Sequence, residues 1–143
     1  MSHLAKDVLV VDDDEHIRNL IAFALTRAGL TVDTAADGLH ALEHLTERTY
    51  AVLLLDLSMP RMDGPGVLKE IRAFHREGDE KPIILVLTAA TEREPLAPVA
   101  EMVQAVITKP FDVHELRALV QDCVLVRQRH AGMSPVGPER NIA

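Results

Sequence analysis

Short apolar segments alternate with segments of helical periodicity along the chain, and this alternation limits the folds that the chain can adopt. Apolar runs such as DVLVVDD, residues 7–13, lack the polar alternation of half-exposed strands and are typical of parallel strands covered on both faces. Strands that alternate with helices predict an α/β fold, in which right-handed crossovers place helices on both faces of a parallel sheet. The predicted strands are residues 7–13, 31–36, 50–56, 82–90 and 105–108.

Apolar residues spaced three or four apart indicate helices in the segments between these runs. Asp14 is placed to cap the first helix and Gly29 to end it, and Asp112 with Glu115 forms a capping box for the last one. We therefore expect a flavodoxin-like, doubly wound, five-stranded parallel sheet of strand order 2-1-3-4-5 with five helices. The predicted helices are residues 15–28, 38–48, 65–77, 91–104 and 112–129.

A length of 143 residues fits one domain with one core. We expect residues 1–130 to form this domain, and residues 131–143, which are rich in Pro and Gly, to be a disordered tail or a truncated linker. The single cysteine, Cys123, shares an apolar helical stripe with Leu116 and Val120, which predicts a buried structural thiol.

The charge and hydropathy of the chain exclude some classes of function. A formal net charge of -7 without a basic stripe argues against direct binding of nucleic acid. No apolar run approaches the roughly 20 residues of a membrane-spanning helix, and the start MSHLAKD lacks the apolar stretch of a secretion signal. We therefore expect a cytoplasmic protein that makes no membrane contact.

Acidic residues stand where two of the predicted strands end. Asp12 and Asp13 close the first strand and Asp56 closes the third, and these strands are neighbours in the expected order. Carboxylates that lie this close repel each other, so the cluster requires a cation or raised pKa values. Magnesium suits such a site best, because it prefers hard oxygen ligands and retains waters that a phosphate can displace.

A carboxylate beside such an ion can attack a phosphoryl group and become an aspartyl phosphate, and Asp56 is the candidate nucleophile. Thr88, at the end of the fourth strand, and Lys109, at the end of the fifth, can supply donors to the phosphoryl oxygens. Taken singly, an Asp after a strand is usually a turn former or a cap, and a Lys is usually solvated. Their joint placement at one sheet edge favours the chemical interpretation.

Four motifs, VLVVDDDEHIR, LLLDLSMPRMDG, PIILVLTAA and ITKPF, resemble the response-regulator receiver domain in order and spacing across about residues 7–129. The resemblance implies that Asp13, Asp56 and the backbone carbonyl of Ser58 hold Mg2+, while Asp12 supports its water shell. It further implies that Asp56 accepts phosphate from a sensor histidine kinase or a histidine phosphotransfer protein, and that Thr88 and Lys109 bind the phosphoryl oxygens. The resemblance also implies that the protein is not an enzyme in the usual sense, because it would promote only its own phosphorylation and its slow autodephosphorylation.

Two features depart from the family pattern. Many receivers carry an aromatic switch residue that moves together with the Thr, but here the position holds Val106, whose stiff side chain has no ring to sweep a pocket. We expect Val106 to be buried, as apolar strand residues usually are. Pro95 and Pro98 interrupt the fourth helix, so we expect it to start late and run short, with a mobile segment at 89–98.

Two other functions remain open at this stage. A haloacid-dehalogenase-type phosphohydrolase also uses an aspartyl nucleophile with magnesium, and Asp12 with Asp14 superficially offers its Asp-x-Asp pair. Its motif, however, has Thr or Val where this chain has His16, and such enzymes need a longer chain. The other is a degenerate receiver that binds partners without phosphate. In every case the downstream protein target is unknown, and a weak homodimer is a further candidate assembly.

Overall fold

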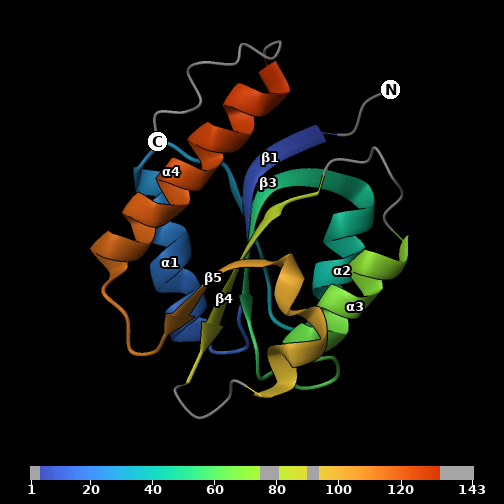
Figure 1. Ribbon diagram of the computed structural model, residues 1–143. Helices are drawn as coiled ribbons and strands as arrows, with labels where there is room; N and C mark the ends of the chain where they lie inside the picture. Colours follow the sequence, from blue (N-terminus) through green and yellow to red (C-terminus); the bar gives the residue numbers. More distant parts are fainter. Residues whose placement is uncertain (1–3, 75–80, 90–93, 133–143) are drawn as a thin grey trace.

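The computed structural model describes residues 4–74, 81–89 and 94–132. In it, a parallel sheet lies between two layers of helices (Figure 1). Helices of the α type are α1 (Glu15–Arg27), α2 (Gly38–Glu47), α3 (Gly64–Phe74) and α4 (Val113–Gly132), and η1 (Glu94–Met102) is a 3-10 helix. The strands are β1 (Leu4–Val11), β2 (Val32–Ala35), β3 (Arg48–Asp56), β4 (Ile83–Thr88) and β5 (Val103–Thr108).

The strand order is β2-β1-β3-β4-β5 and all pairings are parallel, which confirms the predicted topology. Val11 of β1 pairs with Leu55 of β3, so the residues that follow each strand emerge side by side. Thr88 of β4 pairs with Thr108 of β5. The register therefore brings the ends of four strands to one edge of the sheet, as expected for a doubly wound fold.

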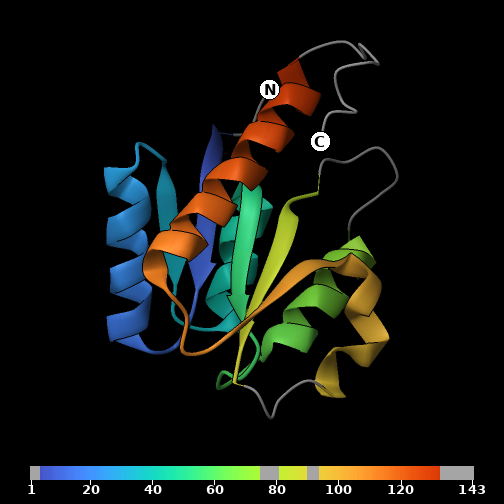
Figure 2. The same ribbon diagram turned by 60° about the vertical axis from the view of Figure 1, so that its left-hand side comes forward.

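Helices cover both faces of the sheet (Figure 2). The side chains buried on the two faces form two hydrophobic clusters. Side chains alternate along β3: Leu53 and Leu55 pack toward α2, α3 and η1, while Val52 and Leu54 pack toward α1 and α4. All four are fully buried, and full burial of such a side chain contributes about 2 kcal/mol. Cys123 belongs to the second cluster and is 9% exposed, as predicted for a structural thiol.

Capping residues begin the helices where the sequence indicates. The Asp14 side chain accepts hydrogen bonds from the backbone N–H groups of His16 and Ile17 at the start of α1. Asp112 Oδ1 accepts from two backbone N–H groups in the first turn of α4. Gly29 follows α1 with a φ of 93°, a conformation that favours glycine.

The fourth of the five expected helices is a 3-10 helix, η1, rather than an α-helix. Pro98 lies inside it, and the helical path is broken at Val99, where φ is −125° and ψ is 17°. Since proline removes a backbone donor and obstructs the preceding turn, a regular α-helix cannot continue through this segment. Residues 90–93 lie outside the described part of the chain, so the mobility expected for 89–98 stays a prediction.

The expectation that Val106 is buried is wrong, because this side chain is 40% exposed. Ala105 and Ile107 pack toward α4, so Val106 points to the opposite face of the edge strand β5. There η1 packs against α3, where Arg72 forms an ion pair of 2.7 Å with Glu101. The kinked segment therefore leaves Val106 partly uncovered.

At the end of the described chain, α4 reaches Gly132, and residues 133–143 lie outside the described part. The division of the chain near residue 130 therefore stays a prediction. Within the described residues, no helix is both long enough and apolar enough to span a bilayer.

Candidate functional site

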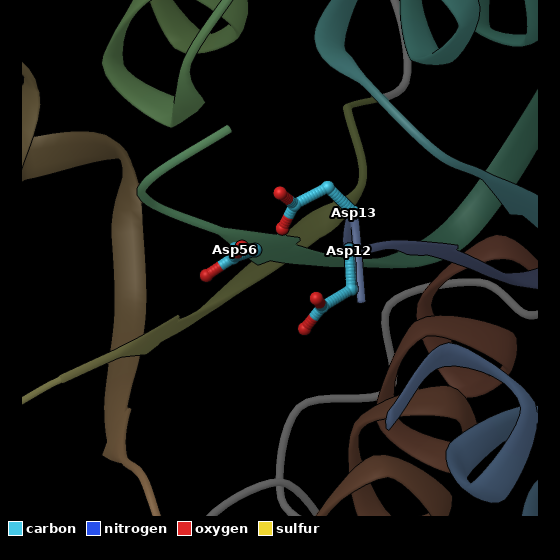
Figure 3. Close-up of side chains that lie close together, drawn as sticks. All are labelled: Asp12, Asp13 and Asp56. Atoms are coloured by element: carbon cyan, nitrogen blue, oxygen red, sulfur yellow. The ribbon is translucent and has the colours of Figure 1, made fainter. Parts of the chain in front are cut away.

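Three carboxylates lie together at the carboxyl ends of β1 and β3 (Figure 3). Ligand oxygens of Asp12, Asp13 and Asp56 all lie within 4.8 Å of one another. Asp13 is exposed, whereas Asp12 is fully buried and Asp56 is 3% exposed. The sequence prediction that these acids converge is therefore confirmed by the geometry.

Hydrogen bonds from Asp14, the N-cap residue of α1, and from Arg18 within α1 fix the position of Asp12. The backbone N–H of Asp14 donates to Asp12 Oδ1 over 2.9 Å. The guanidinium of Arg18 donates to the backbone carbonyl of Asp12, also over 2.9 Å. Both the carboxylate and the backbone carbonyl of Asp12 are therefore held by hydrogen bonds in the turn between β1 and α1.

Lys109 supplies a cation to the acidic cluster. Its Nζ lies 3.2 Å from Asp12 Oδ2 and 3.2 Å from Asp56 Oδ1. Burial alone would lower the pKa of Lys109, but the two carboxylates outweigh it and the pKa is raised, so the ammonium stays charged. One positive charge therefore faces two buried carboxylates, and Asp13 adds a third negative charge nearby.

Burial raises the pKa of Asp56 from the ordinary 3.8 to about 6, with repulsion from Asp12 adding to the effect and Lys109 opposing it. At neutral pH most of this group is therefore still ionised and able to act as a nucleophile. A cation placed against it would relieve the repulsion and lower the pKa again.

Thr88 is fully buried at the end of β4, next to the Asp56 strand. Its hydroxyl donates to the backbone carbonyl of Ala89 over 2.9 Å. The backbone N–H of Lys109 donates to the carbonyl of Thr88 over 2.8 Å, which joins the ends of β4 and β5. Both predicted phosphate-binding residues therefore lie at the same sheet edge as the acids, and the Lys109–Pro110 peptide bond that follows is cis.

The donor set fits a magnesium ion. All three acids offer carboxylate oxygens, which Mg2+ prefers, and they come from two rigid strand ends. In addition, the buried Asp12 Oδ2 has no well-aligned hydrogen bond within the described residues, although Lys109 lies nearby. Ser58, the fourth expected ligand, is exposed in the loop after β3, and the role of its carbonyl stays a prediction.

Sequence reasoning missed one ion pair beside the site. Arg61, in the loop between β3 and α3, donates from its guanidinium to Asp37, the buried N-cap residue of α2. These residues are 24 positions apart, so no local pattern predicts the contact. Asp37 preceding a helical stretch could have been identified as an N-cap, but not as the partner of Arg61.

This fold and site define the class of the protein. The model for the response regulator receiver domain matches residues 8–121, and the chain belongs to this family. It is 38% identical over 120 residues to the DNA-binding transcriptional regulator NtrC of Escherichia coli, covering 82% of this chain and 24% of that protein. It is 33% identical over 129 residues to the probable transcriptional regulator ycf27 of Cyanidium caldarium, covering 90% of this chain and 50% of that protein.

Solved structures agree with this assignment. A CheY-like receiver domain protein from Methanospirillum hungatei has a TM-score of 0.78 and 30% identity, covering 89% of this chain and 99% of that chain. The response regulator TrrA from Thermotoga maritima, solved in complex with Mg2+-BeF, has a TM-score of 0.69 and 31% identity, covering 82% of this chain and 98% of that one. This chain therefore matches whole receiver domains but spans half or less of the two regulators compared above.

Proposed function

We propose that this chain is a phosphoacceptor switch, in which Asp56 accepts a phosphoryl group in a magnesium-dependent reaction. The observation that carries the proposal is the placement of a buried, ionisable Asp56 beside two further acids and 3.2 Å from the Lys109 ammonium. Its relative from Thermotoga maritima was solved with Mg2+-BeF, which supports the same chemistry here.

In the proposed reaction, a carboxylate oxygen of Asp56 forms a bond to phosphorus as the bond from phosphorus to the donor nitrogen breaks. The electron pair of that bond leaves with the imidazole of a phosphohistidine, and Asp56 becomes an acyl phosphate. Asp13, Asp56 and the Ser58 carbonyl would hold Mg2+, with Asp12 supporting its water shell, and the bound ion would supply positive charge to the transferring oxygens.

Lys109 starts the reaction paired with Asp56 and Asp12, so its ammonium is already placed where new negative charge develops. Thr88 offers a hydroxyl from the end of the adjacent strand. When Lys109 and Thr88 turn to the phosphoryl oxygens, the ends of β4 and β5 shift, and this changes the populations of two conformations. Water then slowly hydrolyses the acyl phosphate. Val106, which is exposed on β5, would take part in this conformational change in place of the aromatic switch residue of many receivers.

The proposed phosphoryl donor is a sensor histidine kinase or a histidine phosphotransfer protein. Phosphorylation would alter the binding of a downstream protein, and a weak homodimer of this chain is a further candidate complex. The relatives named as DNA-binding or transcriptional regulators are longer than this chain. With a net charge of -7, we expect this part to signal in the cytoplasm without itself contacting nucleic acid or membrane.

Intact-mass analysis after incubation with acetyl phosphate tests the proposal directly. We expect the wild-type chain to gain one phosphoryl group when Mg2+ is present and none when it is chelated. Asp56→Asn should not be labelled. Asp14→Asn is a matched control, because Asn also caps helices and Asp14 lies beside the acidic cluster without belonging to it, so labelling should persist.

Three outcomes would contradict the proposed function. Labelling that persists in Asp56→Asn would place the acceptor elsewhere. A wild-type chain that folds but takes no phosphate would favour a receiver that binds partners without phosphorylation. Sustained turnover of a general phosphatase substrate would favour the haloacid-dehalogenase-type alternative.

A further inference from the structure

We infer that Arg61 is a positioning residue of the acidic site, and that its ion pair with Asp37 fixes the loop carrying Ser58. This loop, residues 57–63, connects β3 to α3, and the inference rests on the proposed magnesium site. The start of α2 contributes no predicted ligand, but through this ion pair it would influence the affinity of the site for Mg2+.

The ion pair joins a buried acid to an otherwise exposed arginine. Arg61 Nε lies 3.1 Å from Asp37 Oδ2, and Nη2 bonds the same oxygen. The other oxygen of Asp37 accepts from the backbone N–H of His40 over 2.9 Å, which caps α2. Asp37 is 5% exposed, so its charge needs a partner, and Arg61 is the cation that reaches it among the described residues.

The backbone of Arg61 shows why the loop needs such a contact. Its φ is 66°, in the left-handed region that side chains other than glycine rarely adopt. A free loop would relax toward a commoner conformation. The guanidinium contacts to Asp37 offset the unfavourable backbone and hold the loop in this one.

Packing at the start of α2 supports the same role. A Cβ added to Gly38 would lie 2.3 Å from the carbonyl oxygen of Met62, so α2 contacts the loop backbone directly. At its base the loop is held by Leu57, whose N–H donates to Leu87 and whose carbonyl accepts from Gly64, over 3.0 and 2.9 Å. Ser58 lies between these anchors and Arg61.

The acids and Ser58 are therefore held in different ways. Asp12, Asp13 and Asp56 lie at the ends of β1 and β3, whose pairing in the sheet does not involve the loop. Ser58 depends on the loop. Loss of the Arg61–Asp37 pair should weaken Mg2+ binding while leaving the phosphorylation rate at saturating Mg2+ nearly unchanged, a split that general destabilisation would not produce.

Magnesium titration of the full chain, followed by backbone amide chemical shifts, tests the inference without requiring activity. The variants are Asp37→Asn, Arg61→Asn and the double variant. Asn keeps the cap at position 37 and tolerates a positive φ at position 61, so each substitution removes mainly the charge contact. We expect each single variant to bind Mg2+ about three- to tenfold more weakly. This is at or below the low end of the roughly 10- to 100-fold effects of residues that bond metal ligands directly, because Arg61 acts only through the loop.

The double variant should bind no more weakly than either single variant, because both remove the same contact. Arg72→Ala is the control: it breaks an exposed ion pair of α3, with Glu101, and should leave Mg2+ affinity unchanged. Thermal unfolding of each variant checks that it folds, and Arg61→Lys should recover part of the affinity.

Three results would overturn the inference. Unchanged Mg2+ affinity in Arg61→Asn would show that the loop keeps its conformation without the Arg61–Asp37 ion pair. Weaker binding in Arg61→Asn but not in Asp37→Asn would show that the arginine acts without this partner. A wild-type chain that binds no Mg2+ would overturn the proposed metal site itself, and this inference with it.

Discussion

Replacing Asp56 by Asn should stabilise the fold at neutral pH in the absence of Mg2+, although it abolishes the proposed chemistry. The carboxylate is 3% exposed and faces Asp12, and these contacts raise its pKa from 3.8 to about 6. A raised pKa means that the folded protein holds the proton more tightly than the unfolded chain does. Between pH 3.8 and about 6, stability therefore falls as the pH rises, because unfolding releases a proton that the folded state still holds, and a higher pH favours that release.

The magnitude follows from the two pKa values. Each tenfold difference in proton affinity corresponds to 1.36 kcal/mol, so the ionised Asp56 costs the folded state about 3 kcal/mol at pH 7.5. Asn has nearly the same shape without the charge. It still buries a polar amide, so we expect a net gain of about 1 to 3 kcal/mol.

Urea unfolding in EDTA at pH 7.5 and pH 4.5 measures this difference. At pH 7.5 the midpoint for Asp56→Asn should exceed that of the wild type with an unchanged slope, and at pH 4.5 the gap should largely close. Added Mg2+ should stabilise the wild type more than the variant. If Asp56→Asn is equally or less stable than the wild type at pH 7.5, burial and repulsion do not destabilise the ionised carboxylate.

Three further substitutions or modifications test other contacts. Lys109→Met should destabilise the metal-free chain by about 3 kcal/mol in urea unfolding at pH 7.5, because two buried carboxylates lose their cation; unchanged stability would contradict the ion pairs at 3.2 Å. Burial raises the pKa of the Cys123 thiol, so a thiol reagent should label it slowly in the native chain and fast in urea, and rapid native labelling would show that α4 is loosely packed. Arg72→Ala should cost less than about 1 kcal/mol in thermal unfolding because its ion pair is exposed, whereas a larger loss would make this pair essential for holding η1.

Strand order and the acidic cluster could be predicted because both depend on short-range patterns. The apolar run into Asp56 marks a buried strand, and the alternation with helices determines which strands are parallel. Once the order is known, Asp12 and Asp56 must meet, since parallel strands end at the same edge. Pro98 likewise predicts a broken helix from local backbone chemistry alone.

Features that depend on distant packing could not be predicted in the same way. Val106 is an apolar residue of a type usually found in the core. Its exposure depends on where η1 packs, and the sequence of the strand does not determine that packing. The Arg61–Asp37 contact combines a positive φ with a partner from another element. An arginine in a surface loop is usually solvated, and the Arg61 side chain is 65% exposed, so the sequence gives no sign that it also pairs with a buried acid.

The position of β3 has a consequence for how the molecule opens. β3 pairs with β1 on one side and β4 on the other, and its last five residues are buried, so its amides should exchange with deuterium only through global unfolding. β5 lies at the edge of the sheet beside the kinked η1, and its amides should exchange through smaller local openings. We therefore expect the proposed acceptor to stand on a slowly exchanging central strand, with β4 between it and the edge strand β5. Local opening at β5 would then leave the strand that carries Asp56 in place.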